Sequence, residues 1–130
     1  MKTVNDIYNV LGQSVVENAP DNWEKAILQI EVLQDFSSYN GFYITSKGKH
    51  EMSVFDFPVE TGDYIRELHK IITKGGTNKW NKANFTVTPD KKFDMEFKWD
   101  QEWQDEVDEN NRKQAEKDPK YVPPKWHWEK

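Results

Sequence analysis

The amino-acid sequence predicts an α+β fold in one domain, with an antiparallel sheet of about five strands, an N-terminal helix, a central helix and an acidic C-terminal helix. Two observations lead to this prediction. Segments in which apolar residues recur at every second position are interspersed with segments in which they recur at every third or fourth position. The chain of 130 residues also has no internal repeat and no dividing linker, so residues 1–130 are expected to form a single domain.

The first third of the chain predicts one helix and one strand. Thr3 and Asp6 provide capping groups and Pro20 provides a stop, which indicates a helix over residues 3–18. Its apolar residues at helical spacing are Val4, Ile7, Tyr8, Leu11 and Val15. The run EKAILQIEVLQDF after Trp23 alternates with a period of two, which favours a strand with one solvated side, although a short helix also fits this run.

Turn residues then divide the next part of the chain. Residues 37–41 (SSYNG) predict a turn, and Phe42 to Ile44 predict a strand after it. Lys47-Gly48-Lys49 predicts a second turn, followed by a strand from His50 to Phe57 that Pro58 ends.

From Thr61 the pattern becomes helical. Gly75-Gly76 ends this central helix, whose acidic residues come early and whose basic residues come late, as the helix dipole favours. Its predicted apolar stripe consists of Tyr64, Ile65, Leu68, Ile71 and Ile72.

Residues 83–103 predict a β-hairpin around Pro89-Asp90-Lys91-Lys92. One face of its second strand is expected to be buried and aromatic, with Phe93, Met95, Phe97 and Trp99; the other face carries Asp94, Glu96, Lys98 and Asp100. Residues 100–118 then predict a solvated helix with few apolar contacts. Trp126 and Trp128, on one side of an extended segment, suggest that the C-terminal end is held against the domain.

Acidic charge is concentrated in one segment. The formal net charge is −5, but residues 94–109 alone contain eight acidic residues and one lysine, a local balance of −7. Such a segment repels phosphate, so we expect no direct binding of nucleic acid. A basic protein is the partner that this charge favours.

The sequence has no cysteine, no apolar run of membrane-spanning length and no signal peptide, which together predict a soluble, cytoplasmic protein without membrane contact. His50, His69 and His127 lack the spacing of metal ligands, and no nucleophile or phosphate-binding motif occurs. Acidic residues 105–109 lack the spacing of a calcium loop. We therefore expect neither catalytic residues nor a metal nor a cofactor.

Three segments resemble the YezG-like or EsaG-like immunity family, the antitoxins of bacterial polymorphic toxins. These segments are PDNWEKAILQIEVL, SSYNGFYIT and FTVTPDKKFDMEFKWD. The resemblance implies that the protein binds and neutralises the C-terminal domain of a cognate toxin, commonly a nuclease, inside the producing cell.

Charge agrees with this implication, because a nuclease holds a polyanion in a basic cleft that a row of carboxylates can cover. Trp103 is the expected aromatic anchor at this contact. The expected acidic contact residues are Asp94, Glu96, Asp100, Glu102, Asp105, Glu106, Asp108 and Glu109.

Two other interpretations stay open at this point. An adaptor or structural module would bind its partner through the apolar sheet face or the C-terminal tryptophans. A small hydrolase would use Asp94 and Glu96, and would need a concave pocket around them. We favour a monomer, although an uncovered sheet edge could pair with a second copy.

Overall fold

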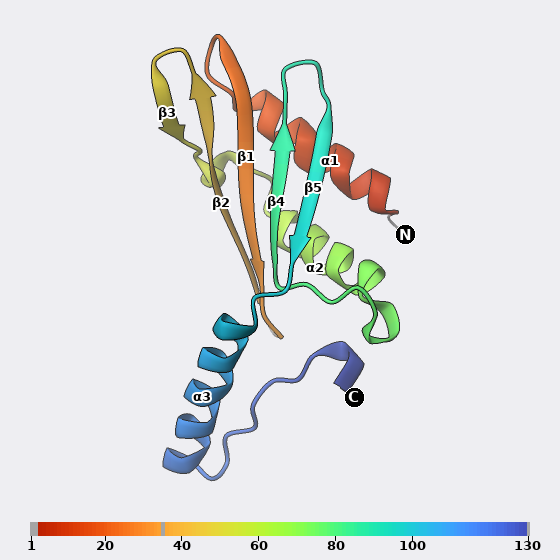
Figure 1. Cartoon of the computed structure of the whole chain (residues 1–130), viewed down its shortest axis with the longest axis vertical. Coiled ribbons are helices and arrows are strands. Elements are labelled where there is room, and N and C mark those ends of the chain that lie inside the picture. The colour runs from red at the N-terminus through yellow and green to blue at the C-terminus, as the bar shows by residue number, and fades with distance from the viewer. Residues whose placement is uncertain (1–2, 35, 130) are drawn as a thin grey trace.

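A computed structural model describes residues 3–34 and 36–129 and confirms the α+β fold (Figure 1). Five strands form one antiparallel open sheet in the order β3-β2-β1-β4-β5. The elements in chain order are α1 (Val4–Glu17), β1 (Trp23–Val32), β2 (Ser37–Thr45), β3 (Gly48–Glu51), the 3₁₀ turn η1 (Val54–Asp56), α2 (Thr61–Ile72), η2 (Lys74–Gly76), β4 (Lys82–Val87), β5 (Phe93–Lys98), α3 (Gln101–Lys117) and η3 (His127–Glu129).

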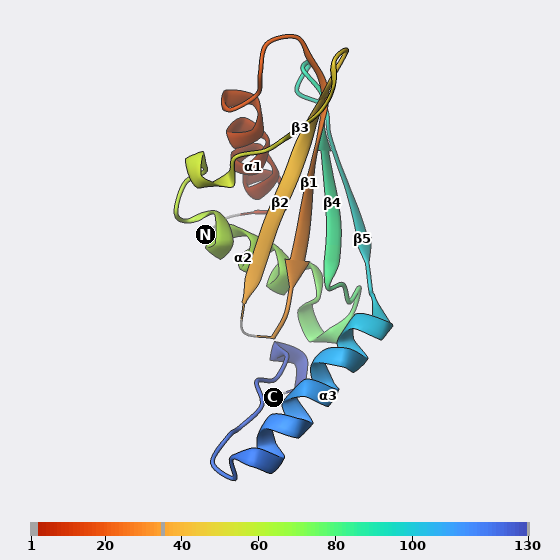
Figure 2. The ribbon, with the colours of Figure 1, turned by 90° about the vertical axis from the view of Figure 1, so that its left-hand side faces the viewer.

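Helices α1 and α2 cover one face of the sheet, and the core lies between the two layers (Figure 2). The opposite face carries no other element of the described chain, and α3 projects beyond the end of the sheet. The residues that are almost completely buried in this core include Ile7, Leu11, Val15, Ala26, Leu28, Ile30, Ile65, Leu68, Phe85 and Val87. Each of these residues belongs to an apolar pattern with the period of a helix or a strand. The helices and strands therefore bury the faces that the sequence predicts.

The predicted capping of α1 is confirmed. The Asp6 N–H donates to the Thr3 hydroxyl at 3.1 Å, and the Thr3 N–H donates to the Asp6 carboxylate at 3.0 Å. Gly12 has a role in packing, because a Cβ there would lie 2.3 Å from the ring of Phe93 on β5. Glycine therefore lets the sheet edge approach the helix.

The predicted turn at residues 37–41 is wrong, because β2 runs through all of these positions. The chain reverses earlier, where the Leu33 N–H donates to the Phe36 carbonyl at 2.8 Å. Gly41 serves the close approach of two strands: a Cβ there would lie 2.3 Å from the Ile27 carbonyl oxygen on β1. Pairing along the whole length of β1 therefore outweighs the local preference for a turn.

The strand predicted from His50 to Phe57 is also wrong in extent. The turn around Lys47 is confirmed, but β3 ends at Glu51 and η1 follows. Leaving the sheet allows Phe57 to enter the core and stack on Tyr39, with ring centroids 5.8 Å apart. Phe55 instead points into solvent, with 96% of its surface exposed.

The central helix and the hairpin are confirmed with two corrections. Ile71 belongs to the predicted stripe of α2 but lies at its margin and is exposed. Phe97 is also exposed, because β5 is an edge strand and its aromatic face is only partly covered. Gly75, with φ of 70°, ends the helical region as glycine readily does.

The acidic C-terminal helix is confirmed as α3, in which Gln104 is the buried residue. The segment after it, residues 118–129, returns along α3 towards the sheet and is named here the return segment (Figure 1). Trp126 is buried and stacks on Trp128 with ring centroids 4.8 Å apart, which confirms that the C-terminal end is held against the domain. The segment is not extended throughout, because residues 127–129 form a 3₁₀ turn. Of the described helices, none has the length and apolar character needed to cross a membrane.

Candidate interaction surface

The position of α3 depends on a polar junction at the end of β5. Asp100 caps the helix, and its carboxylate accepts a hydrogen bond from the Trp103 N–H at 3.1 Å. Lys82 on β4 lies 2.9 Å from the same carboxylate. The hydrogen bond from Lys82, followed by that from the Trp103 N–H, lowers the pKa of Asp100 below its usual value. Asp100 is therefore a structural link between sheet and helix.

Asn81 completes this junction from the buried side. Its main-chain N–H donates to the Lys98 carbonyl at 3.0 Å, and its own carbonyl accepts from the Val32 N–H at 2.9 Å. Its side-chain amide pairs with the main chain of Asp100. One buried residue thus connects the ends of β1 and β5 with the first residue before α3.

Trp103 also belongs to the junction. Its ring is half-buried, and the ammonium group of Lys82 lies 5.0 Å from its centroid. Lys82 therefore contacts the helix cap and the first turn together. The sequence predicted that Trp103 is an aromatic anchor for a partner. In the structure, part of its ring packs against Lys82 of the protein's own sheet, so only the rest is exposed.

Four of the predicted contact residues lie together on the outward side of α3. They are named here the acidic stripe and consist of Glu102, Asp105, Glu106 and Glu109, all exposed and at positions i, i+3, i+4 and i+7 of the helix.

The stripe is only partly neutralised. Within residues 3–34 and 36–129, Glu102 and Glu106 have no ion-pair partner. Glu109 pairs with Arg112, and the hydrogen bond from that guanidinium lowers the pKa of Glu109. Asp105 accepts from the Gln101 amide at 2.8 Å. The stripe therefore keeps a net negative charge, most of it on Glu102, Asp105 and Glu106.

The remaining predicted residues lie elsewhere. Asp94 and Glu96 alternate with Phe93 and Met95, so they lie on the uncovered face of the sheet. Asp108 accepts a hydrogen bond from Gln104 at 2.9 Å and faces the return segment. The nine predicted residues therefore occupy the stripe, the junction, the sheet face and the inner side of α3.

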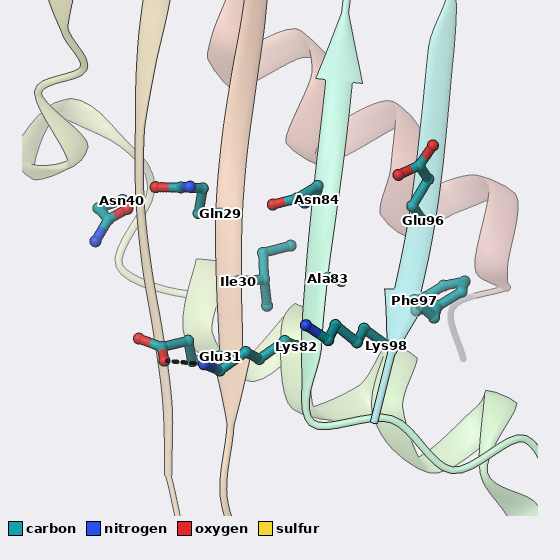
Figure 3. Close-up of a pocket in the computed structure, with 10 residues that line it drawn as sticks. All are labelled: Gln29, Ile30, Glu31, Asn40, Lys82, Ala83, Asn84, Glu96, Phe97 and Lys98. Atoms are coloured by element: carbon teal, nitrogen blue, oxygen red, sulfur yellow. Dashed lines mark ion pairs between the residues drawn. The ribbon is translucent and has the colours of Figure 1, made fainter. Parts of the chain in front are cut away.

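A polar groove crosses the uncovered sheet face and has a volume of about 430 Å³ (Figure 3). Two rows of paired residues line it. Asn40, Gln29, Asn84 and Glu96 form one row across four strands, and Glu31, Lys82 and Lys98 form the next. The alternation of β1 predicted a wet face, but the rows depend on strand register, which no single segment reveals.

His69 on α2 and His127 in the return segment are far apart in the chain, but their ring centroids lie 5.9 Å apart. His50 lies on β3, with its Nε2 3.0 Å from the Thr45 hydroxyl. Burial, opposed in part by the hydrogen bond from His69 Nε2 to the Trp80 carbonyl, lowers the pKa of His69 to about 4. Among the residues that the structure describes, no group of three or more His, Asp or Glu side chains could hold a metal ion.

Comparison of the sequence with protein-family models and with curated proteins finds no match. The resemblance to the YezG-like family therefore depends on the three sequence segments given above.

Proposed function

We propose that this protein is an immunity protein that binds and neutralises a cationic toxin domain, a nuclease, through the acidic stripe of α3. The proposal is based on the exposed position of that stripe. Glu102, Asp105, Glu106 and Glu109 lie on a helix that projects beyond the sheet (Figure 2), so a partner can approach them without meeting the body of the domain.

Contacts at the start and in the second half of α3 support the same function. The Asp100 junction holds the start of α3, and the Tyr121 hydroxyl of the return segment donates to Asn111 at 3.1 Å. Carboxylates on a held helix lose less conformational entropy on binding than those on a loose tail. A fixed row of negative charge also imitates a nucleic-acid backbone, and a nuclease cleft is built to bind such a row.

The groove on the sheet face is compatible with a second contact area, but Asp94 and Glu96 there are exposed side chains. A hydrolase acid requires a setting that keeps its proton near neutral pH, commonly burial. Exposure of both carboxylates therefore favours binding over hydrolysis. The adaptor interpretation would use the same surfaces without inhibiting its partner.

The test replaces the four acids of the stripe with lysine and measures inhibition of the cognate toxin domain, which the proposal expects to be a nuclease encoded beside the gene. We expect the association rate constant to fall at least tenfold at low salt. It should also no longer decrease as the salt concentration rises, because four lysines repel a cationic partner instead of attracting it. The matched control carries the same charge change at the exposed positions Asp21, Glu24, Asp56 and Glu60, away from α3.

Equal inhibition by the stripe variant and the unmodified protein would contradict the proposal. An adaptor would be indicated if the protein bound the nuclease at equal stoichiometry and the nuclease stayed active.

A further inference from the structure

A pocket of about 220 Å³ lies between the start of α3 and the return segment. Three indoles line it, Trp99, Trp126 and Trp128, and it is named here the indole pocket. Trp126 and Trp128 stack with an interplanar angle of 7°, and Trp99 stands at 57° to Trp126 with ring centroids 5.9 Å apart. Trp99 and Trp128 are only half-buried, so part of their aromatic surface faces the pocket.

The charges around the indoles favour a cation. Asp108 and Glu129 line the pocket, and the ammonium group of Lys79 already lies 5.3 Å from the ring centroid of Trp128. A cation over an indole is the strongest of the common cation–π pairs. The chain thus supplies a weakly held cation of its own, on an exposed side chain that can be displaced.

Gln104 gives an independent indication of a ligand. It lines the same pocket, is only 5% exposed, and its Oε1 accepts no hydrogen bond from any described group, while its Nε2 donates to Asp108. A buried acceptor without a donor is unfavourable. This oxygen is almost inaccessible in the free chain, so a donor that enters the pocket would satisfy it after a small shift of the Gln104 side chain; Lys79 makes no hydrogen bond to it.

The indole pocket is continuous with the acidic stripe. The side-chain amide of Gln101 accepts from the Trp99 Nε1–H at 2.8 Å and donates to Asp105 of the stripe at 2.8 Å. A protein that covers the stripe therefore also reaches the mouth of the pocket.

We infer that the indole pocket binds one arginine side chain of the partner, whose guanidinium displaces Lys79 and packs among the indoles. Arginine fits better than lysine because its planar group stacks on aromatic rings and has five donors for Gln104, Asp108 and Glu129. The volume suits one side chain, since cofactor pockets are larger. The identity of the partner rests on the proposed function; the chemistry of the pocket does not.

The test is an NMR titration of the full chain with N-acetyl-arginine methylamide, with the lysine analogue run in parallel. We expect saturable shifts of the Trp99 and Trp128 indole signals and of the Gln104 side-chain amide, whereas the Trp23 indole, at the start of β1, should not move. Lys79→Ala should tighten arginine binding at least threefold, and Lys91→Ala, an equal charge change in the hairpin turn, should not.

Trp99→Leu should reduce binding of the arginine analogue at least tenfold, and the fold of this variant is checked by its remaining signals. The inference is overturned if the indole signals do not respond, or if Lys79→Ala and Lys91→Ala bind alike. The four-lysine stripe variant should still bind the analogue. If the pocket responds but this variant inhibits the nuclease as well as the unmodified protein does, the proposed function alone is refuted. Inhibition with an unresponsive pocket refutes this inference alone.

Discussion

The side-chain amide of Asn81 forms two hydrogen bonds with the main chain of Asp100: its Nδ2 donates to the Asp100 carbonyl at 3.0 Å, and its Oδ1 accepts from the Asp100 N–H at 2.7 Å. Asn81 is completely buried. It fixes the residue that caps α3, so the direction in which the acidic helix leaves the sheet is set inside the domain.

Asn81→Ala should lower the free energy of unfolding by about 2–4 kcal/mol, because the Asp100 N–H loses its acceptor and the Asp100 carbonyl keeps only the hydrogen bond from the Gln104 N–H. Urea denaturation measures this loss. Asn84→Ala, on the exposed face of the neighbouring β4, should change stability by less than about 0.5 kcal/mol. Equal stability of the two variants would show that the junction does not hold α3.

Gly12→Ala should destabilise the protein by about 1–3 kcal/mol, although alanine normally favours a helix, because the added methyl group collides with the Phe93 ring. Phe93→Leu in the same chain should recover part of the loss. Thermal unfolding compares both variants with Gly62→Ala on α2, where a Cβ meets its nearest atom at 3.4 Å. A stabilising Gly12→Ala would contradict the close packing of α1 on β5.

Acidification should destabilise the protein through His69. Its pKa is about 4 in the folded chain and 6.5 in a model peptide, so between these values the unfolded state binds more protons. Stability should be unaffected by this group above pH 6.5 and should fall by about 3 kcal/mol on reaching pH 4.

Urea midpoints at pH 7, 5 and 4 measure the effect of His69. His69→Gln should lose most of the decrease, while His50→Gln, on exposed β3, should keep the wild-type profile. Among the described residues, His69 faces the carbonyl and ring of Trp80 and the rings of Trp126, His127 and Trp128, and it shares a small pocket with Arg66 and Lys70. An unchanged pH profile in His69→Gln would assign the acid sensitivity to other groups.

Local patterns predict the elements of this fold well. Helical spacing found α1, α2 and α3, and alternation found β1 and the β4–β5 hairpin, because each pattern reflects the face that its own element buries. The errors at residues 37–41 and at His50 to Phe57 come from strand pairing and from the path to the core, which involve distant residues. Phe97 is exposed because its strand lies at the sheet edge.

In the candidate site, too, local patterns predict some features, and contacts between distant residues determine the others. Composition located the acidic segment, and helical geometry places Glu102, Asp105, Glu106 and Glu109 on one side of it. Composition alone does not distinguish Asp100 and Asp108 from these four residues. Asp100 pairs with Lys82 on β4, and Asp108 accepts from Gln104 on the side of α3 that faces the return segment. Asn81 and the indole pocket combine residues far apart in the chain, and only the tertiary structure brings them together.

Carboxyl labelling tests the central claim most directly. Free protein and its complex with the nuclease domain are treated with a carbodiimide and glycinamide, and labelling is read for each peptide by mass spectrometry. Binding should reduce labelling at Glu102, Asp105, Glu106 and Glu109 and leave Asp21 and Glu24 unchanged. Unchanged labelling of those four carboxylates in a fully formed complex would contradict the claim that α3 is the docking surface.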